Sequence, residues 1–276
     1  MSQAHDVLAG ARNDGRGVGA FNVVLLEHAE AFVAAAEAAQ LPVILQISQN
    51  CVAYHGALAP VLAATQALAR ACDVPVLVHL DHADDLGLVR AAVAAGVDSV
   101  MYDGSRLPYA ENVATTRDVV DLCHANDVQV EAELGEVGGK DGVHAPGVRT
   151  DPTEAATFVA ATGVDALAVA VGTSHAMTDR VASVDTGLIA ALAGALPVPL
   201  VLHGSSGLSD EELQGAVAAG MTKINISTHL NSVFTAAVRG VLLGAPNLVD
   251  PRKYVAPGRD AVTTETARLL RLLAGT

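Results

Sequence analysis

Asp81 and His82 are adjacent residues whose types and position suggest chemistry, and they end an aliphatic run from Pro75 that is typical of a buried strand. In parallel α/β folds, catalytic and metal-binding groups commonly lie where strands end. His79, two residues earlier, would then lie beneath the site. A local explanation is also open, in which Asp84 caps the next helix and His82 is simply solvated. A motif this short does not separate the two interpretations.

Ionisable side chains recur at three further strand ends. The fifth predicted strand ends in Glu131 and Glu133, and their spacing of two residues puts both carboxylates on one face. His175 follows the sixth predicted strand, and His203 ends the seventh. Together with His82, they place three histidines around one mouth, which matches a catalytic zinc with three protein ligands and an open position. Each histidine could instead form a local hydrogen bond, but three converging by chance is less expected.

Two turns of small residues predict an anion site at the same mouth. Gly204 to Gly207 follows the seventh predicted strand, Asn225 to Thr228 follows the eighth, and each turn precedes a helix. Helix N-termini and exposed backbone amides bind phosphate without a basic side chain, and these two loops are a common phosphate site in barrel enzymes. Such a site would let an acidic protein hold an anionic substrate. Two ordinary capped turns are the alternative.

Eight strand–helix units position these residues. The predicted strands span 18–22, 42–48, 75–81, 98–102, 128–133, 165–171, 198–203 and 221–226. The predicted helices span 27–40, 58–72, 86–95, 110–126, 186–195, 210–219, 230–243 and 260–273, and one more begins at Pro152 after a cap at Asp151. This pattern predicts an α/β fold, a (β/α)8 TIM barrel with an additional C-terminal helix, as a single domain over 1–276. A doubly wound open sheet is the alternative, but no Gly-x-Gly-x-x-Gly follows the first strand.

The composition excludes several classes of protein. The 276 residues are 51% hydrophobic but only 3% aromatic, which predicts a core of Val, Leu, Ile and Ala in parallel strands covered by alanine-rich helices. A net charge of −14 argues against nucleic acid or an anionic membrane as a partner. No run of residues predicts a transmembrane helix or a signal peptide. Three widely spaced cysteines fit a reduced, cytoplasmic protein.

Motifs along nearly the whole chain resemble those of one enzyme family. They are His-Leu-Asp-His at 79–82, Ser-Val-Met-Tyr-Asp-Gly-Ser at 99–105, Val-Glu-Ala-Glu-Leu-Gly at 130–135, Ala-Val-Gly-Thr-Ser-His at 170–175, Val-Leu-His-Gly-Ser-Ser-Gly at 201–207, Lys-Ile-Asn-Ile-Ser-Thr at 223–228 and Asp-Pro-Arg-Lys-Tyr at 250–254. In this order they resemble the class II, metal-dependent ketose-bisphosphate aldolases, which include the fructose- and tagatose-bisphosphate aldolases. The resemblance implies a lyase of carbohydrate metabolism that reversibly cleaves a ketose 1,6-bisphosphate to dihydroxyacetone phosphate and glyceraldehyde 3-phosphate.

The resemblance also implies roles for the predicted site residues. His82, His175 and His203 would hold one catalytic Zn²⁺, and Glu133 would stand beside it as an alternative or supporting ligand. Asp81 would be the acid/base at the C4 oxygen of the substrate. A zinc on the ketone and hydroxyl oxygens would stabilise the carbanion that retro-aldol cleavage leaves. A monovalent cation is left open as a second ion.

Substrate contacts follow from the same resemblance. The dihydroxyacetone phosphate part would be bound by Gly204, Ser205, Ser206, Asn225, Ile226, Ser227 and Thr228, with a backbone amide from Ala176. Asn22 and Ser48 match substrate-side positions, whereas the roles of Asp103 and Ser105 stay open. The resemblance further implies a homodimer or homotetramer. The sequence leaves undecided which C4 epimer is cleaved.

Two departures from the family pattern keep other functions open. The loop after the fifth strand lacks the family's glutamate that moves the C3 proton, and Asp141, one methylene shorter, is the expected replacement. Ala256 stands where some fructose-bisphosphate enzymes supply an arginine from a neighbouring subunit. A non-catalytic partner subunit is therefore one alternative. A Schiff-base aldolase using Lys223 is another, because a buried lysine with a lowered pKa suits that chemistry.

Overall fold

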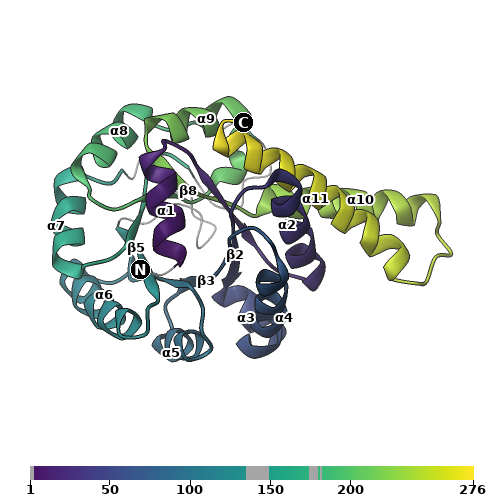
Figure 1. The fold of residues 1–276 in the computed structure, drawn as a ribbon, viewed down its shortest axis with the longest axis horizontal. Coiled ribbons are helices and arrows are strands. Elements are labelled where there is room, and N and C mark those ends of the chain that lie inside the picture. Colours follow the sequence, from purple (N-terminus) through teal and green to yellow (C-terminus); the bar gives the residue numbers. More distant parts are fainter. Residues whose placement is uncertain (1–2, 135–148, 174–179, 181) are drawn as a thin grey trace.

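The computed structural model describes residues 3–134, 149–173, 180 and 182–276, and its centre is a closed parallel β-barrel (Figure 1). The strands are β1 (Val18–Asn22), β2 (Val43–Ser48), β3 (Val76–Ala83), β4 (Ser99–Tyr102), β5 (Gln129–Leu134), β6 (Ala166–Val169), β7 (Leu200–Leu202) and β8 (Met221–Ile226). Each strand pairs with the next in the chain, and β8 pairs with β1 to close the ring. The predicted (β/α)8 barrel is confirmed.

Helices surround the barrel (Figure 1). They are α1 (Gln3–Asn13), α2 (Leu26–Ala39), α3 (Gln49–His55), α4 (Leu58–Ala71), α5 (Leu86–Ala94), α6 (Tyr109–His124), α7 (Pro152–Thr162), α8 (Thr186–Ala195), α9 (Asp210–Ala219), α10 (Thr228–Gly244) and α11 (Arg252–Ala274), with a 3₁₀ turn at Ser205–Gly207. Among the described residues, no single helix is both long and apolar enough to cross a membrane; the sharply bent pair α3–α4 passes that test only when combined.

The additional C-terminal helix is confirmed, but α11 begins at Arg252 rather than near residue 260. Its first part contains Pro257, which a helix tolerates poorly. Tertiary packing explains why the helix still forms there. Gly258 lies so close to Phe234 of α10 that an added Cβ would come within 2.8 Å of the ring. The two helices lie side by side and project from the barrel (Figure 1).

Helix caps follow the sequence signals with one correction. The Asp151 side chain accepts hydrogen bonds from the amides of Thr153 and Glu154 at the start of α7, as predicted. The prediction of Asp84 as the cap of the next helix is wrong. Asp85 is the cap, and its Oδ1 accepts a 2.7 Å hydrogen bond from the Gly87 amide. The shift arises because β3 continues to Ala83, two residues beyond its predicted end.

Two helices were not predicted, α1 and the short α3. α1 lies across the N-terminal end of the barrel (Figure 1), where its Leu8 packs with Ile44 and Leu77 from the first halves of β2 and β3. Arg12 of α1 also donates to the backbone oxygens of Leu196 and Pro197, just before β7. These contacts seal the bottom of the barrel. The opposite end, where the strands finish, is called the mouth.

Candidate active site

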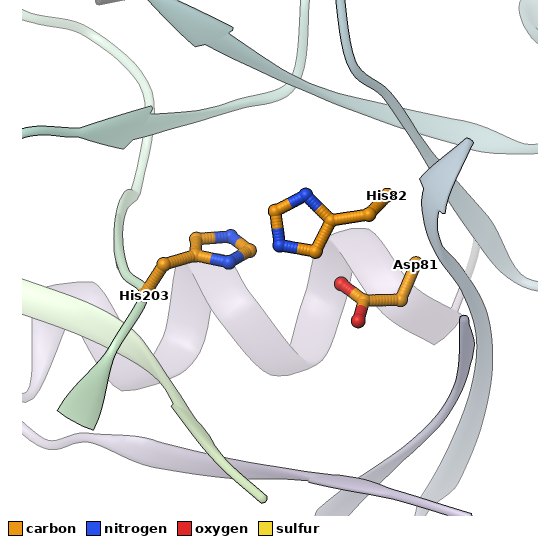
Figure 2. A group of neighbouring side chains, drawn as sticks. All are labelled: Asp81, His82 and His203. Atoms are coloured by element: carbon orange, nitrogen blue, oxygen red, sulfur yellow. The ribbon is translucent and has the colours of Figure 1, made fainter. Parts of the chain in front are cut away.

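Asp81 and His82 lie at the mouth end of β3, and both side chains point toward the same space (Figure 2). Neighbouring residues of a regular strand point to opposite faces. His82 escapes this rule because its φ is +47°, in the left-handed region, and the pairing of β3 with β4 is irregular between Leu80 and Ala83. Such a conformation costs about 1–3 kcal/mol outside glycine. The strain lets two consecutive residues serve one site.

His203 reaches the same space from the end of β7 (Figure 2), and its side chain is buried. Its ring meets that of His82 edge to face, with centroids 4.6 Å apart. Nε2 of His203 lies 2.9 Å from Oε1 of Glu131, and the backbone oxygen of His203 accepts a 2.6 Å hydrogen bond from Thr173 Oγ1. The amide nitrogen of Asn225 lies 3.2 and 3.3 Å from the two ring nitrogens, so it contacts the face of the ring. Contacts on three sides fix this imidazole.

The side chains of Asp81, His82 and His203 form a donor set that fits a metal ion. Their ligand atoms all lie within 4.8 Å of one another, as do those of a second set, His82 with Asp103 and Glu133. Imidazole and carboxylate donors in this combination suit zinc. Within the described chain, Oδ1 of Asp81 is buried and has no hydrogen-bond partner, which is the state expected of an atom that faces a cation or a substrate.

Asp103 gives His82 a defined orientation. Nδ1 of His82 lies 3.1 Å from Oδ2 of Asp103, whose other oxygen accepts hydrogen bonds from the Ser105 amide and hydroxyl. Metal-binding histidines are usually held in this way by a carboxylate on the ring nitrogen that the metal does not take. The structure thus supplies the contact that the sequence left open for Asp103 and Ser105.

Asp81 is held as a carboxylate by its neighbours. Asn22 Nδ2 donates a 2.9 Å hydrogen bond to Asp81 Oδ2, and Gln46 Nε2 donates to Asn22 Oδ1 at 3.3 Å. Burial alone raises the pKa of Asp81. The neighbouring imidazoles and the Lys223 ammonium, together with the hydrogen bond from Asn22, outweigh burial and lower that pKa below its ordinary value. Asp81 can therefore accept a proton at neutral pH.

A cavity of about 200 Å³, open to solvent at the mouth, joins this donor set to the two predicted anion turns. Its lining residues are Asn22, Ser48, Asn50, Asp81, His82, His203, Gly204, Ser206, Asn225, Ser227 and Thr228. Ten of these eleven were predicted as site residues; Asn50, on the unpredicted α3, was missed. Ser205 and Ile226 were also predicted, but the Ser205 hydroxyl donates to the Leu202 oxygen and the Ile226 side chain packs in the apolar layer around the barrel.

The two turns meet at the cavity wall. Gly204 has a φ of +69°, a left-handed conformation that glycine adopts without strain, and it starts the 3₁₀ turn Ser205–Gly207. Ser206 Oγ accepts a 3.3 Å hydrogen bond from the Ser227 amide, and α10 begins at Thr228. The turn is braced from behind, where the Ala182 amide donates to the Gly207 oxygen at 2.9 Å. Backbone amides and a helix N-terminus at one wall suit an anion.

Three predicted site residues lie outside the described residues: Asp141, His175 and Ala176. Glu133 is buried on β5, in the second donor set rather than in the cavity lining. Lys223 does point into the barrel, as its parity with Asn225 predicted, but its ammonium is 2.6 Å from Glu131 Oε2 and the residue is only 1% exposed. A paired, enclosed amine disfavours the Schiff-base alternative.

Comparison with known proteins decides the family. The family profile described as fructose-bisphosphate aldolase class-II matches residues 2–276. This chain belongs to that family. It is accordingly a ketose-bisphosphate aldolase and a lyase, and the metal dependence of class II applies to it. The alternative of a non-catalytic partner subunit is not supported by this membership.

Individual relatives agree with the family assignment. The chain is 41% identical over 249 residues to a fructose-bisphosphate aldolase from Geobacillus stearothermophilus, which covers 89% of this aldolase and 87% of the relative. The crystal structure of the YdjI aldolase from Escherichia coli K12 is 29% identical, with a TM-score of 0.83 over 98% of this chain and 95% of that one. A fructose-bisphosphate aldolase from Campylobacter jejuni, at 23% identity and a TM-score of 0.83, covers 99% of this chain and 95% of that one and supports the fold alone.

Proposed function

We propose that this aldolase acts as a single-domain enzyme that reversibly cleaves a ketose 1,6-bisphosphate of the fructose or tagatose type to dihydroxyacetone phosphate and glyceraldehyde 3-phosphate. The observation that carries the proposal is the convergence of Asp81, His82 and His203 in one cavity with two amide-bearing turns. Cleavage of a phosphorylated ketose needs ligands for a metal ion, a carboxylate that accepts a proton, and donors that bind the phosphate.

His82 and His203 would hold a zinc ion together with His175, and Glu133 would serve as an alternative ligand. The orientation of two of these rings supports the assignment, because carboxylates hold Nδ1 of His82 and Nε2 of His203. This leaves Nε2 of His82 and Nδ1 of His203 as the nitrogens that a metal would take. When bound, zinc supplies Lewis-acid polarisation of the substrate's ketone and hydroxyl oxygens. A monovalent cation stays part of the proposal without assigned residues.

Asp81 performs the proton transfer at C4. Its carboxylate accepts the proton of the C4 hydroxyl as the C3–C4 bond breaks and the aldehyde forms, and it returns that proton in the direction of condensation. The lowered pKa of Asp81 favours the form that accepts the proton. Asn22 holds the carboxylate by its Oδ2, which leaves Oδ1 facing the reaction.

The anion turns hold the dihydroxyacetone phosphate half. Amides near Gly204, Ser206 and Ser227 and the N-terminus of α10 would bind its phosphate, with Ala176 contributing an amide. Because these donors are backbone amides, a chain of net charge −14 can hold the phosphate without basic side chains in the site. Ser48, at the end of β2, also lines the cavity and would contact the rest of the sugar.

Asp141 would move the C3 proton of dihydroxyacetone phosphate in place of the family's glutamate. We expect Asp141→Ala to slow exchange of that proton with solvent while zinc stays bound, because the metal donors are untouched. Exchange can be followed by NMR in deuterated water without cleavage of a bisphosphate. Unchanged exchange in the variant would reject this role.

A cytoplasmic homodimer or homotetramer completes the proposal. The pair α10–α11 projects from the barrel, and the loop that joins the two helices lies at its outer end (Figure 1). Leu243, in the last turn of α10, is 77% exposed, and Val249, in the joining loop, is 87% exposed. Exposed apolar side chains on a projecting element are typical of a surface that another subunit covers.

The experiment is a substrate panel run with and without metal. Chelation should abolish cleavage of fructose and tagatose 1,6-bisphosphates, and added zinc should restore it. His82→Ala and His203→Ala should each lose zinc, whereas His55→Ala, on the exposed α3, should keep it. Cleavage that survives chelation and instead shows borohydride trapping would contradict the metal mechanism. Zinc bound normally by His82→Ala and His203→Ala would contradict the site.

A further inference from the structure

A chain of polar side chains runs from His203 into the barrel, and the proposed mechanism uses only its first contact, between His203 and Glu131. We call it the buried relay; it consists of the buried residues His203, Glu131, Lys223 and His79, and it ends at the half-buried Ser99. Oε1 of Glu131 lies 2.9 Å from Nε2 of His203, and its Oε2 lies 2.6 Å from Nζ of Lys223. The same Nζ lies 3.4 Å from Nε2 of His79, whose Nδ1 lies 2.7 Å from Ser99 Oγ.

The relay is enclosed by the barrel. Lys223 and His79 are each 1% exposed and Glu131 is 3% exposed, and neighbouring interior positions hold the apolar side chains of Met101 and Val201. A buried lysine–glutamate pair is weak evidence for stability, because apolar replacements of similar volume are often neutral or stabilising. Stability therefore does not account for two opposite charges at this depth.

Donor and acceptor chemistry gives the relay one direction. The Lys223 ammonium can only donate, so Nε2 of His79 accepts and its Nδ1 carries the proton that bonds Ser99. The Glu131 carboxylate can only accept, so Nε2 of His203 carries a proton. Since both Glu131 oxygens are engaged, the carboxylate cannot turn away from His203 without also leaving Lys223. Nδ1 is then the ring nitrogen of His203 that carries the lone pair.

We propose that Lys223 is a positioning residue for metal binding, which acts through Glu131 to fix His203 with its proton on Nε2 and with Nδ1 presented to the metal. Lys223 touches neither substrate nor metal in this role. The inference deepens the proposed function and rests on its assignment of His203 as a metal ligand.

The test measures zinc affinity of the full-length enzyme by competition with a chromophoric chelator, without any activity assay. Lys223→Met removes the ammonium but keeps an unbranched side chain, and it should weaken zinc binding by about tenfold, as loss of a carboxylate–histidine support does. Glu131→Gln should weaken it at least as much. Because Lys223 acts through Glu131, the double variant should bind zinc no more weakly than Glu131→Gln alone.

Met101→Ala is the matched control, since Met101 lies beside Glu131 in the barrel register and the change disturbs packing in the same interior without removing a charged or hydrogen-bonding group of the relay. It should lower the melting temperature and leave zinc affinity unchanged. Zinc affinity that is unchanged or tighter in Lys223→Met, or equally weakened in Met101→Ala, would overturn the proposal. If Lys223→Met does not fold, Glu131→Gln and the double variant decide: equal affinities support the relay, and a further tenfold loss in the double variant rejects it.

His203→Ala separates this inference from the proposed function. If His203→Ala binds zinc as tightly as the wild type, the metal site itself is wrong. If His203→Ala loses zinc while Lys223→Met keeps it, the metal site stands and the relay alone is wrong.

Discussion

The two ends of the barrel are built from the same eight strands, but the bottom holds apolar side chains and the mouth holds ionisable ones. At the bottom, α1 seals an apolar layer that includes Leu8, Ile44 and Leu77. At the mouth, the corresponding interior positions hold ionisable side chains such as Asp81 and His203, which are buried yet held by hydrogen bonds. Apolar burial at the bottom stabilises the fold, whereas the mouth contains a strained backbone at His82 and a buried charge at Asp81. We therefore expect substitutions at the two ends to change different observables.

Asp81→Asn should give the largest effect, at the mouth. The amide cannot accept the C4 proton, so kcat should fall by about 10²–10⁴-fold while the melting temperature changes little. Asp84→Asn is the matched control, because Asp84 is an exposed rim carboxylate that contacts Gln49 rather than the cavity. Steady-state kinetics on both variants tests the comparison. If Asp81→Asn has the same kcat as the wild type, Asp81 does not transfer the C4 proton.

Leu77→Ala should give the opposite result, at the bottom. It removes a fully buried side chain from the layer that α1 seals, so the free energy of unfolding should fall by about 2–5 kcal/mol. Leu77→Met, which nearly conserves volume, should cost less than about 1.5 kcal/mol. Denaturant unfolding measures both variants. If Leu77→Ala is folded but has a kcat far below that of the wild type, the claim that the bottom affects stability and not catalysis is wrong.

A smaller effect is expected from two glycines with similar left-handed backbones. Gly204 has a φ of +69° at the anion wall, and Gly96 has a φ of +75° on the loop that enters β4, with open space around it. Alanine is strained at both positions, by about 1 kcal/mol or more. Gly204→Ala should raise KM about tenfold, whereas Gly96→Ala should lower the melting temperature and leave KM unchanged. The same KM in both variants would show that the wall does not bind the substrate.

The smallest effect concerns pH and His28, near the mouth end of α2. His28 is buried beside Phe32 and Phe234, and burial lowers its pKa, opposed in part by Glu27. The unfolded chain takes up the proton near pH 6.5, but the folded chain does so only at lower pH. The free energy of unfolding should therefore fall as the pH drops below about 6.5.

His28→Gln should flatten this pH dependence, since the side chain no longer titrates. Melting temperatures at pH 7.5 and 5.5 provide the measurement. Identical pH dependence in His28→Gln and the wild type would show that other groups cause the acid sensitivity.

The sequence predicted the repeating architecture well because aliphatic runs and alanine-rich helices alternate throughout it. It missed α3, which has only seven residues, and α1, which precedes the first strand and so lies outside the strand–helix repeat. It ended β3 early because a left-handed φ at His82 cannot be inferred from a histidine. The result was a cap assigned one residue too soon, at Asp84 instead of Asp85.

Site residues at strand ends were predictable, because parallel strands bring their C-terminal ends to one mouth. The contacts that orient them were not. Glu131 and Lys223 are 92 positions apart, and their meeting depends on the barrel's register. Glu131 was noted only for sharing a face with Glu133, and nothing in its local sequence indicates a bond to His203. Long-range pairings of this kind require coordinates.

The most direct test of the central claim is a crystal structure of the zinc-loaded enzyme with anomalous data collected at the zinc absorption edge. Our account predicts one strong anomalous peak at the mouth, bound by His82, His203 and His175, with Asp81 facing the adjoining cavity. A peak elsewhere, or zinc bound without the two imidazoles of His82 and His203, would contradict it.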